Sequence, residues 1–530
     1  MIGRRPLLAA GLAGLATPDA IAAVNEAVAE TQYGKVRGSV VDGIQTFKGI
    51  PYGASTSGTG RFRAPSPPAP WAGIRDALDF GPMCPQLVRP LPSIFGSWTF
   101  DKAMSEDCLA LNVWTPAIGD GRRRPVMVWF HGGDFSSLSG SRNVFDGARL
   151  CHRGDVVVVT VNHRLNIFGY LHLGDLNPAF ADSGNAGMLD LVAALRWVRD
   201  NITGFGGDPA NVTIFGQSGG GAKVTTIMAM PSAQGLFHKA IVQSGSYYLA
   251  AMDRSRGTQL AEILLRTLNI KPEDAAKLAN LPVEQLVQGL EAAARTPERP
   301  NYRPVADGRV LPGGPWAPSA PTMSANVPLM VGTVATEMTL LIGAGDPATF
   351  TLDAAGLRHR LGNWFAADDI DKVIVTFSKA QPDGKPSDLF FAIATDVQMR
   401  QGAWHQAERK SAQQSAPAYL YELDWQTPVD GGKWKTPHSL ELALVFDNVA
   451  KSASMVGDGP EPQRLADQMS AAWIAFATTG NPNTPAIPHW PAYDSTQRAT
   501  MVFNTTSQVV NDFRGDERRL LDGLKTTSTM

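Results

Sequence analysis

The sequence lacks the residue patterns that hold metal ions in proteins. It has only three cysteines in 530 residues, and it contains neither a Cys-x-x-Cys pair nor a His-Glu-x-x-His run. Structural and catalytic zinc sites are built from such spacings. We therefore expect a protein without a bound metal or cofactor.

The chain also lacks an excess of charge of either sign. Its 47 Lys and Arg residues are balanced by 49 Asp and Glu residues, which gives a net charge of −2. A basic excess is typical of proteins that bind nucleic acids or anionic membranes. We expect neither kind of partner.

No segment reads as a transmembrane helix, which needs about 20 apolar residues. The apolar run over residues 7–16 is half that length and follows Arg4 and Arg5. Small-residue sites follow at residues 20–22 and 27–29. This is the layout of a cleaved export signal, with some similarity to a twin-arginine signal, although the full motif is absent.

An export signal over residues 1–29 leaves residues 30–530 as the mature chain. That length suits one large domain or two to three ordinary ones. We see no repeat, low-complexity tract or clear linker in it, so we predict a single domain that is periplasmic or secreted. The alternative is an uncleaved N-terminal tail.

Export would permit a disulfide bond. Cys84 and Cys108 enclose a loop of 23 residues, and a bridge across such a loop contributes about 3 kcal/mol. We predict this disulfide. Cys151, just before an apolar run, is expected to be a buried free thiol.

Strand-like and helix-like segments alternate along the chain. Residues 126–130 and 156–161 are continuous apolar runs, typical of strands buried on both faces of a parallel sheet. Residues 190–202 have the apolar spacing of a helix. Further strand candidates lie at 212–215, 239–245, 327–333 and 417–423. The alternation predicts an α/β fold with a mostly parallel sheet, and residues 251 to about 300 look like a helical insertion over it.

The segment GQSGGG, residues 216–221, places one serine among four glycines. A Gly-x-Ser-x-Gly sequence between a strand and a helix is the nucleophile-elbow pattern. The turn needs small neighbours and presents Ser218 at a helix N-terminus, where developing negative charge is stabilised. The alternative is a glycine-rich turn with an incidental serine.

A nucleophilic serine also needs donors for the oxyanion of its tetrahedral intermediate. The strand candidate 126–130 runs into HGGDF, residues 131–135, which is the expected type of loop. The predicted donors are the backbone N–H groups of Gly133, Asp134 and Gly219. We expect His131 to orient this loop rather than to act as a base.

Residues 205–220, FGGDPANVTIFGQSGG, match the serine signature of the type-B carboxylesterase and cholinesterase family along their whole length. Residues 106–116 resemble the family's second signature, with Ala110 where an aromatic residue or Thr is usual. Other similar segments follow in order at 47–53, 61–62, 184–190, 194–202, 243–246, 477–483 and 490–493. The resemblance implies an α/β-hydrolase fold with insertions over the active site.

The family's chain order is Ser, acid, His. It places a Glu after the strand that follows the insertion, which here is Glu337, and a His before a Glu-x-x-x-x-Phe stretch, which here is His438. The resemblance therefore implies a triad of Ser218, Glu337 and His438. Glu441 is the rival acid, and Ser244 resembles a supporting residue behind the triad.

The resemblance further implies a serine esterase that works through an acyl-enzyme on small-molecule esters, broad on small or apolar ones. Gln217, where cholinesterases carry Glu, argues against choline esters. One alternative is an acyltransferase with the same acyl-enzyme. Another is a binding or adhesion protein of the same fold.

Asp134 departs from the family, which usually has Gly at this point of the loop. The N–H donor survives the change, but a carboxylate aimed at the acyl oxygen would repel the oxyanion. We expect the side chain to turn away and accept hydrogen bonds. The alternatives are that it positions a deacylating water or binds a polar acyl group.

Overall fold

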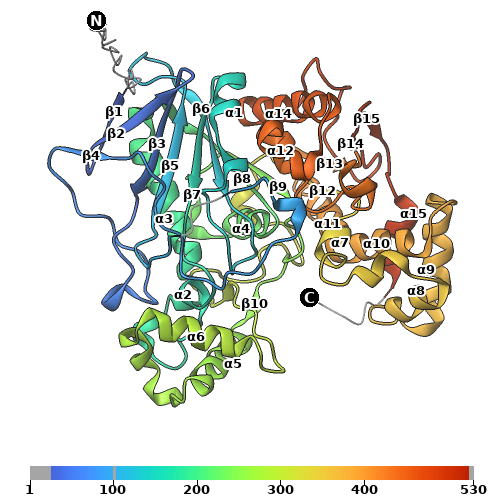
Figure 1. Cartoon of the computed structure of the whole chain (residues 1–530), viewed down its shortest axis with the longest axis horizontal. Coiled ribbons are helices and arrows are strands. Elements are labelled where there is room, and N and C mark those ends of the chain that lie inside the picture. The colour runs from blue at the N-terminus through green and yellow to red at the C-terminus, as the bar shows by residue number, and fades with distance from the viewer. Residues whose placement is uncertain (1–25, 100–102, 525–530) are drawn as a thin grey trace, which may run out of the picture.

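A thirteen-stranded sheet forms the centre of the protein (Figure 1). The structure is a computed structural model that describes residues 26–99 and 103–524. Most of the predicted export signal therefore lies outside the described residues. The sheet strands are β1 Glu26–Thr31, β2 Gly34–Val41, β3 Ile44–Pro51, β4 Ile74–Asp76, β5 Ala110–Thr115, β6 Arg124–Phe130, β7 Val157–Val161, β8 Gly207–Gln217, β9 Lys239–Gln243, β12 Leu329–Val334, β13 Ala418–Leu423, β14 Thr500–Phe503 and β15 Gln508–Val510.

The middle of the sheet is parallel. The order β7-β6-β8-β9-β12-β13-β14 contains only parallel pairs. Antiparallel pairs add β5, β3, β2 and β1 at one side and β15 at the other. This confirms the prediction of an α/β fold with a mostly parallel sheet. Every strand candidate named from the sequence is a strand of this sheet.

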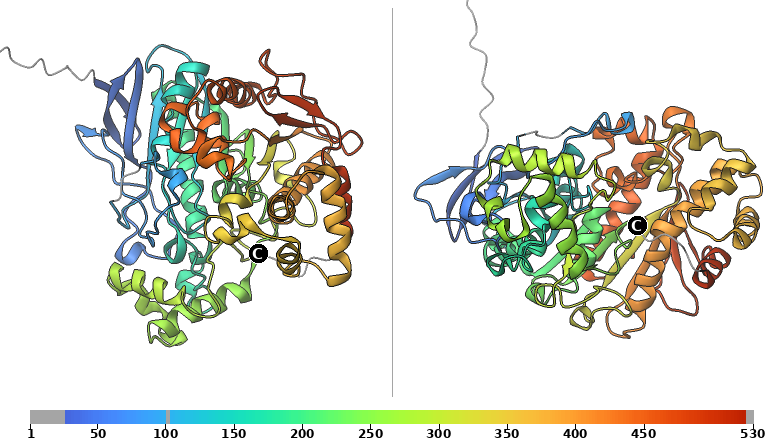
Figure 2. Two further views of the ribbon diagram at one scale, coloured as in Figure 1. Left: turned by 45° about the vertical axis from the view of Figure 1, so that its right-hand side comes forward. Right: turned by 90° about the horizontal axis from the view of Figure 1, so that it is seen from below.

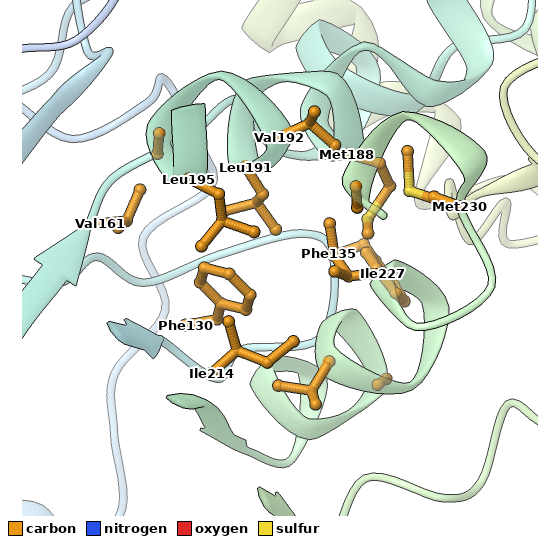
Figure 3. Packing of buried hydrophobic residues seen from close by; sticks show 14 of the residues in the cluster. Phe130, Phe135, Val161, Met188, Leu191, Val192, Leu195, Ile214, Ile227 and Met230 are labelled. Atoms are coloured by element: carbon orange, nitrogen blue, oxygen red, sulfur yellow. The ribbon is translucent and has the colours of Figure 1, made fainter. Parts of the chain in front are cut away.

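Both faces of the sheet are covered by helices, which explains the continuous apolar runs. Alternate residues of β6 enter different cores: Val128 packs with α3, whereas Trp129 packs with α12 and α14. Figure 3 shows Phe130 of β6 close to Leu191 and Leu195 of α3. The bounds are α1 Ala148–Gly154, α2 Asn166–Tyr170, α3 Ala186–Asn201, α4 Gly219–Ile227, α11 Gln401–Ser411, α12 Glu441–Val445, α13 Ala453–Val456, α14 Glu461–Thr479 and α15 Gly515–Gly523.

Two helical insertions stand apart from each other in Figures 1 and 2. The first follows β9 and contains α5 Arg254–Thr267 and α6 Val283–Ala293, flanked by the short pair β10 Met252–Asp253 and β11 Val305–Ala306. It corresponds to the insertion predicted near residues 251–300. The second follows β12 and contains α7 Met338–Leu341, α8 Ala354–Leu361, α9 Ala367–Ala380 and α10 Pro386–Thr395. It has a hydrophobic core of its own, which Leu521 of α15 completes.

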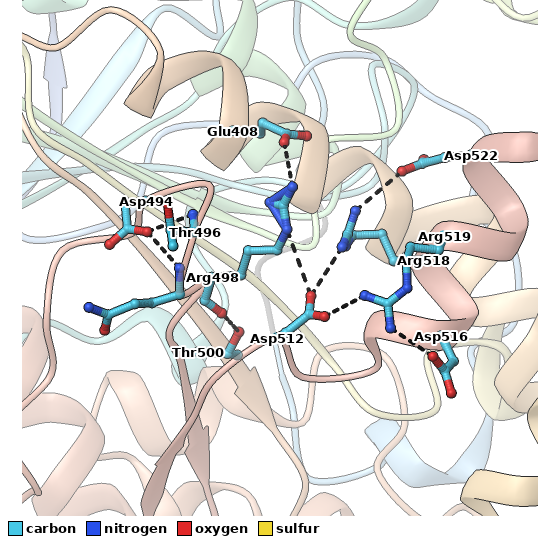
Figure 4. Close-up of polar contacts among 11 residues, drawn as sticks. Glu408, Asp494, Thr496, Arg498, Thr500, Asp512, Asp516, Arg518, Arg519 and Asp522 are labelled. Atoms are coloured by element: carbon cyan, nitrogen blue, oxygen red, sulfur yellow. Dashed lines mark hydrogen bonds and ion pairs between the residues drawn. The ribbon is translucent and has the colours of Figure 1, made fainter.

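Ion pairs attach the C-terminal helix α15 to the body of the protein. Asp512 accepts hydrogen bonds from Arg518 and Arg519 of α15 (Figure 4). It also pairs with Arg498, which in turn pairs with Glu408 of α11. The helix that caps the second insertion is thus linked to the helix that lies against β12 and β13.

The cysteine prediction is wrong for this structure. Cys84 and Cys108 are buried free thiols, as is Cys151. A hydrogen-bonding interaction with Cys84, and then burial, raise the pKa of the Cys108 thiol well above its usual value. The two residues are therefore neighbours, as the sequence predicted, but no covalent bond joins them in the structure. The free thiol predicted at Cys151 is confirmed.

Within the described ranges, no helix is long and apolar enough to cross a membrane.

Candidate active site

Ser218 stands on a strained turn between β8 and α4. Its backbone has φ 56° and ψ −127°, a conformation that costs free energy for any residue other than glycine. The neighbouring glycines are required by space: a Cβ atom on Gly220 would lie 1.9 Å from the carbonyl oxygen of Phe130. The backbone of the turn is therefore in direct contact with the neighbouring strand β6. The serine side chain is the part left facing outward.

The loop after β6 presents two N–H groups because its carbonyl groups are already bound. His131 donates its Nδ1 hydrogen to the Gly132 carbonyl at 2.8 Å, and the N–H of Ser137 binds the Gly133 carbonyl at 3.0 Å. In a trans peptide the N–H points opposite to the C=O. The N–H groups of Gly133 and Asp134 therefore point the other way, and neither donates to another described residue.

Gly219 supplies the third predicted donor at the N-terminus of α4, where helix N–H groups have no partner within the helix. A Cβ atom on Gly219 would lie 2.2 Å from the Cα atom of Asp134. The three predicted donors thus belong to two segments that touch each other. His131 is buried, and burial followed by the charge of Lys223 lowers its pKa well below the usual value, so the ring is neutral.

Lys223, one turn into α4, fixes this loop from behind. Its ammonium group donates to the carbonyl of Asp134 at 2.6 Å and to the carbonyl of His131 at 3.1 Å. Burial lowers its pKa to about 7, against the opposing effect of Asp134. Phe135 anchors the same loop in the core beside Ile227 of α4 (Figure 3). The sequence analysis did not identify Lys223, although it is the one charged residue in an otherwise uncharged helix.

Glu337 and His438 meet at the carboxyl ends of β12 and β13. Glu337 Oε2 lies 2.5 Å from His438 Nδ1, and both side chains are buried. Ser244 donates to Glu337 Oε1 at 2.6 Å, as does the backbone N–H of Val334 at 3.0 Å. A carboxylate accepts hydrogen bonds, so Nδ1 carries the imidazole hydrogen and Nε2 is left as a base.

The base nitrogen faces the residue before the nucleophile. His438 Nε2 lies 3.2 Å from Gln217 Nε2, and Ser439 donates to the other end of that amide, Oε1, at 3.3 Å. No hydrogen bond joins Ser218 to His438 among the described residues. Catalytic hydrogen bonds often tighten only when substrate is bound, so this geometry describes a resting site.

Tyr247 lies near Ser218 and Asp134. Burial of its hydroxyl, and then the charge of Asp134, raise its pKa well above the usual value. Tyr247 follows directly on the segment QSGS. The sequence analysis missed it because a tyrosine at a strand end is usually hydrophobic lining.

Asp134 adopts a left-handed backbone with φ 54°, which Asp tolerates better than larger residues. Burial raises the pKa of its carboxyl group, opposed first by Lys223, then by hydrogen bonding from Asn301 and by the charge of Arg303. Its Oδ1 atom is buried without a hydrogen-bond partner in the described part of the chain. This carboxylate oxygen is thus shielded from solvent.

Glu441, the rival acid, makes no hydrogen bond to His438 in the described structure. Both of its carboxyl oxygens are buried without a hydrogen-bond partner there. Burial, and then the nearby charge of Glu337, raise its pKa to about 8. Glu441 is therefore protonated at neutral pH, and Glu337 is the acidic residue that contacts the imidazole.

A cavity of about 350 Å³ opens beside the oxyanion loop. Ser136, Ser137 and Leu138, which follow that loop, line it, as do Leu290 of α6 and Asn301. The first insertion therefore borders this cavity, whose lining does not include Ser218 or the three predicted oxyanion donors.

Comparison with known proteins identifies the family. The Carboxylesterase family model matches residues 25–520. The para-nitrobenzyl esterase of Bacillus subtilis (strain 168) is 37% identical over 505 residues, which cover 93% of this chain and 98% of that protein. The phenmedipham hydrolase of Pseudarthrobacter oxydans is 30% identical, covering 90% of this chain and 95% of the relative.

A solved structure agrees with the sequence comparison. The crystal structure of a carboxylesterase of Geobacillus stearothermophilus superimposes with a TM-score of 0.82 at 38% identity, covering 93% of this chain and 99% of that one. The α/β-hydrolase fold and the family expected from the sequence motifs are therefore confirmed. The chain belongs to the carboxylesterase family and is a carboxylic ester hydrolase.

Proposed function

We propose that the protein hydrolyses carboxylic esters through a Ser218–His438–Glu337 triad and an acyl-enzyme intermediate. The observation that carries this proposal is the 2.5 Å contact between Glu337 Oε2 and His438 Nδ1. It fixes the imidazole as a base at the carboxyl end of the sheet, the edge at which Ser218 is presented. A buried carboxylate in this position orients the imidazole and stabilises it when it becomes charged.

The mechanism then uses the groups in order. A substrate displaces the resting partners, and His438 Nε2 removes the Ser218 proton as Oγ attacks the ester carbonyl carbon. The N–H groups of Gly133, Asp134 and Gly219 stabilise the oxyanion. His438 returns the proton to the leaving alcohol, and water then attacks the acyl-enzyme with His438 again as base.

Small and apolar esters are the proposed substrates. The cavity beside the oxyanion loop has room for a compact group, and its lining mixes leucines with a few polar residues. The relative named para-nitrobenzyl esterase supports including benzyl esters among the candidates.

We further propose that the protein is exported to the periplasm or secreted. The paired arginines, the short apolar run and the small-residue sites of the N-terminal sequence support this location.

The test is hydrolysis of p-nitrophenyl acetate and p-nitrophenyl butyrate by the purified protein and by Ser218→Ala. We expect turnover by the wild type and a loss of several orders of magnitude in the variant. Ser139→Ala, a buried serine that bonds only Ser141, is the matched control and should retain activity. Wild-type protein that is folded but inert on every activated ester would refute the proposal. Adding methanol and measuring methyl ester separates hydrolysis from acyl transfer.

A further inference from the structure

We propose that Thr336 is a positioning residue for the reaction: its hydroxyl joins the segment that carries Glu337 to the segment that carries His438, and so sets the contact between them. This inference rests on the proposed function, because it concerns catalysis only if Glu337 and His438 are the acid and base of the triad. Thr336 acts through Glu337 rather than by touching the substrate.

Pairing of the strands is not sufficient to bring the acid and the base together. The ladder between β12 and β13 ends with Val334 opposite Leu423. One further bond follows it, from the N–H of Ala335 to the carbonyl of Leu423 at 2.9 Å. Glu337 lies beyond the end of this ladder, and residues 424–437 separate His438 from it. Contacts outside the sheet must therefore fix the position of Glu337 relative to His438.

Thr336 and Thr436, the paired threonines, provide three hydrogen bonds between the two segments. The N–H and the hydroxyl of Thr336 both donate to the carbonyl of Thr436, at 3.2 Å and 3.0 Å. The N–H of Thr436 donates back to the Thr336 hydroxyl at 2.9 Å. Thr336 directly precedes Glu337, and Thr436 lies two residues before His438. The bonds thus join segments 100 residues apart beside the catalytic pair.

A hydroxyl is suited to this connection because it donates and accepts at one atom. The Thr336 hydroxyl gives its hydrogen to the Thr436 carbonyl and accepts from the Thr436 N–H. A methyl group could do neither, and a carboxylate has no hydrogen for the carbonyl. Both threonines are buried, so removing the hydroxyl leaves a buried N–H without its acceptor, which is costly.

Further hydrogen bonds hold each of the paired threonines in place. The Thr339 hydroxyl lies 2.8 Å from the carbonyl of Thr336 and 2.7 Å from the carbonyl of Trp434. The Thr436 hydroxyl donates to the carbonyl of Trp425 at 3.0 Å. Thr339 and Thr436 are fully or almost fully buried. The connection is therefore part of an internal network and has one preferred geometry.

A cavity of about 810 Å³ borders the paired threonines. Thr336 and Thr436 belong to its lining, whereas Glu337 and His438 do not. Glu337 is fully buried. The pairing therefore stands at the boundary between this cavity and the catalytic carboxylate. Separation of the two segments would let water reach Glu337 and weaken its electrostatic effect on the imidazole.

The test compares Thr336→Val, which removes the hydroxyl at nearly constant size, with Thr336→Ser, which keeps it. Steady-state kinetics with p-nitrophenyl butyrate and the Tm are measured for both. Thr115→Val is the matched control. The buried Thr115 hydroxyl also joins two distant segments, because it donates to the carbonyl of Phe205 at 2.8 Å. It lies at the opposite edge of the sheet from Ser218, where β7 begins.

We expect kcat of Thr336→Val to fall about 10- to 100-fold, as displacement of a catalytic group predicts. KM should change less than about threefold, since the lost interaction acts in the transition state. Thr336→Ser should restore kcat to within about threefold of the wild type. Thr115→Val should lower the Tm to a similar extent and leave kcat unchanged.

A second readout does not depend on turnover. A hydrogen held in a short bond to a carboxylate is strongly deshielded, so the Nδ1 hydrogen of His438 should give a far-downfield proton resonance. Its absence in His438→Gln assigns it. We expect this resonance to weaken or move upfield in Thr336→Val and to be restored in Thr336→Ser. In Thr115→Val it should stay as in the wild type.

A kcat of Thr336→Val within about twofold of the wild type would overturn this inference. So would an equal loss of kcat in Thr115→Val, or a folded Thr336→Ser no more active than Thr336→Val. If Thr336→Val does not fold, Thr336→Cys replaces it, because a thiol matches serine in shape but is only a weak donor and acceptor. Wild-type protein that is inert on activated esters would refute the proposed function instead, and the downfield resonance would still report whether Thr336 holds the pair together.

Discussion

The ammonium group of Lys223 donates a 2.6 Å hydrogen bond to the carbonyl oxygen of Asp134. This contact joins the helix that begins at the nucleophile to the loop that carries two of the proposed oxyanion donors. Since the same ammonium group binds the His131 carbonyl, one side chain fixes both ends of the short loop.

Lys223→Met should lower kcat more than it raises KM. Without the two carbonyl bonds the loop loses its fixed orientation, and misplacing one oxyanion donor costs about 2–4 kcal/mol in the transition state. We expect kcat to fall about 30- to 1,000-fold in steady-state assays with p-nitrophenyl butyrate. Lys410→Met is a matched control, because Lys410 is also buried and caps backbone carbonyls, those of Ser324 and Ala325. A similar loss of kcat in both variants would mean that a general packing defect, not the loop, is responsible.

Ser244→Ala should reduce kcat about 3- to 30-fold. The Ser244 hydroxyl donates to Glu337 Oε1, and a hydrogen bond to a charged group is worth about 1–2 kcal/mol. Its loss leaves Glu337 less firmly oriented toward His438. Ser246→Ala is the comparison, since Ser246 is buried two residues further on and bonds Gln406 instead. Kinetics with p-nitrophenyl acetate measure both, and an unchanged kcat in Ser244→Ala would contradict a role in positioning Glu337.

Glu441→Gln should change how stability depends on pH. The carboxyl group of Glu441 has a pKa of about 8 in the folded protein, raised from 4.5 by burial and by Glu337. Between these values the folded state holds a proton that the unfolded state has released, so the free energy of unfolding falls as pH rises from 4.5 to 8. The neutral glutamine lacks this term, which amounts to about 3–5 kcal/mol over the whole window.

The measurement is the difference in Tm between Glu441→Gln and wild type at pH 5, 6.5 and 8. We expect the Tm of the variant to rise relative to that of the wild type at each increase in pH. Glu291→Gln, at an exposed glutamate of α6, should show the same dependence of Tm on pH as the wild type. A difference in Tm that does not vary with pH would show that Glu441 does not bind a proton in the folded state at neutral pH.

Signal cleavage should occur after residue 22 rather than after residue 29. Ala27 and Ala29 are buried in β1, which pairs with β2 from Glu26 to Thr31. Cleavage at the later site would remove most of that strand. N-terminal sequencing of the exported protein should therefore give Ala23 as the first residue. A mature protein that starts at Glu30, with normal thermal stability, would contradict this prediction.

Local sequence patterns were sufficient to predict the sheet and the serine turn. Apolar runs such as residues 126–130 identify buried strands without knowledge of their neighbours, and the glycines around Ser218 require a tight turn. Glu337 and His438 followed from the family resemblance, since neither stands in a motif that marks chemistry by itself. The signals were their order in the chain, the strand before Glu337 and the Glu-x-x-x-x-Phe stretch after His438.

Contacts between distant segments could not be predicted in the same way. Lys223 and Asp134 are 89 residues apart, and nothing local in either segment points to the other. Tyr247 comes near Ser218 only because β8 and β9 are adjacent in the sheet. The bond between Cys84 and Cys108 was predicted wrongly because neighbouring thiols and a disulfide place the same two residues together. Sequence spacing does not distinguish the two redox states.

The second insertion separates the catalytic acid from the base along the chain. Glu337 directly precedes α7, the first helix of that insertion, and His438 comes 101 residues later, after β13. The two residues can meet only when β12 and β13 have paired. The second insertion, which has a hydrophobic core of its own, lies between these two strands in the chain. Contacts between residues so far apart in the chain form slowly. Turnover is thus a reporter of complete assembly, and during refolding from denaturant esterase activity should return after the helical circular dichroism signal.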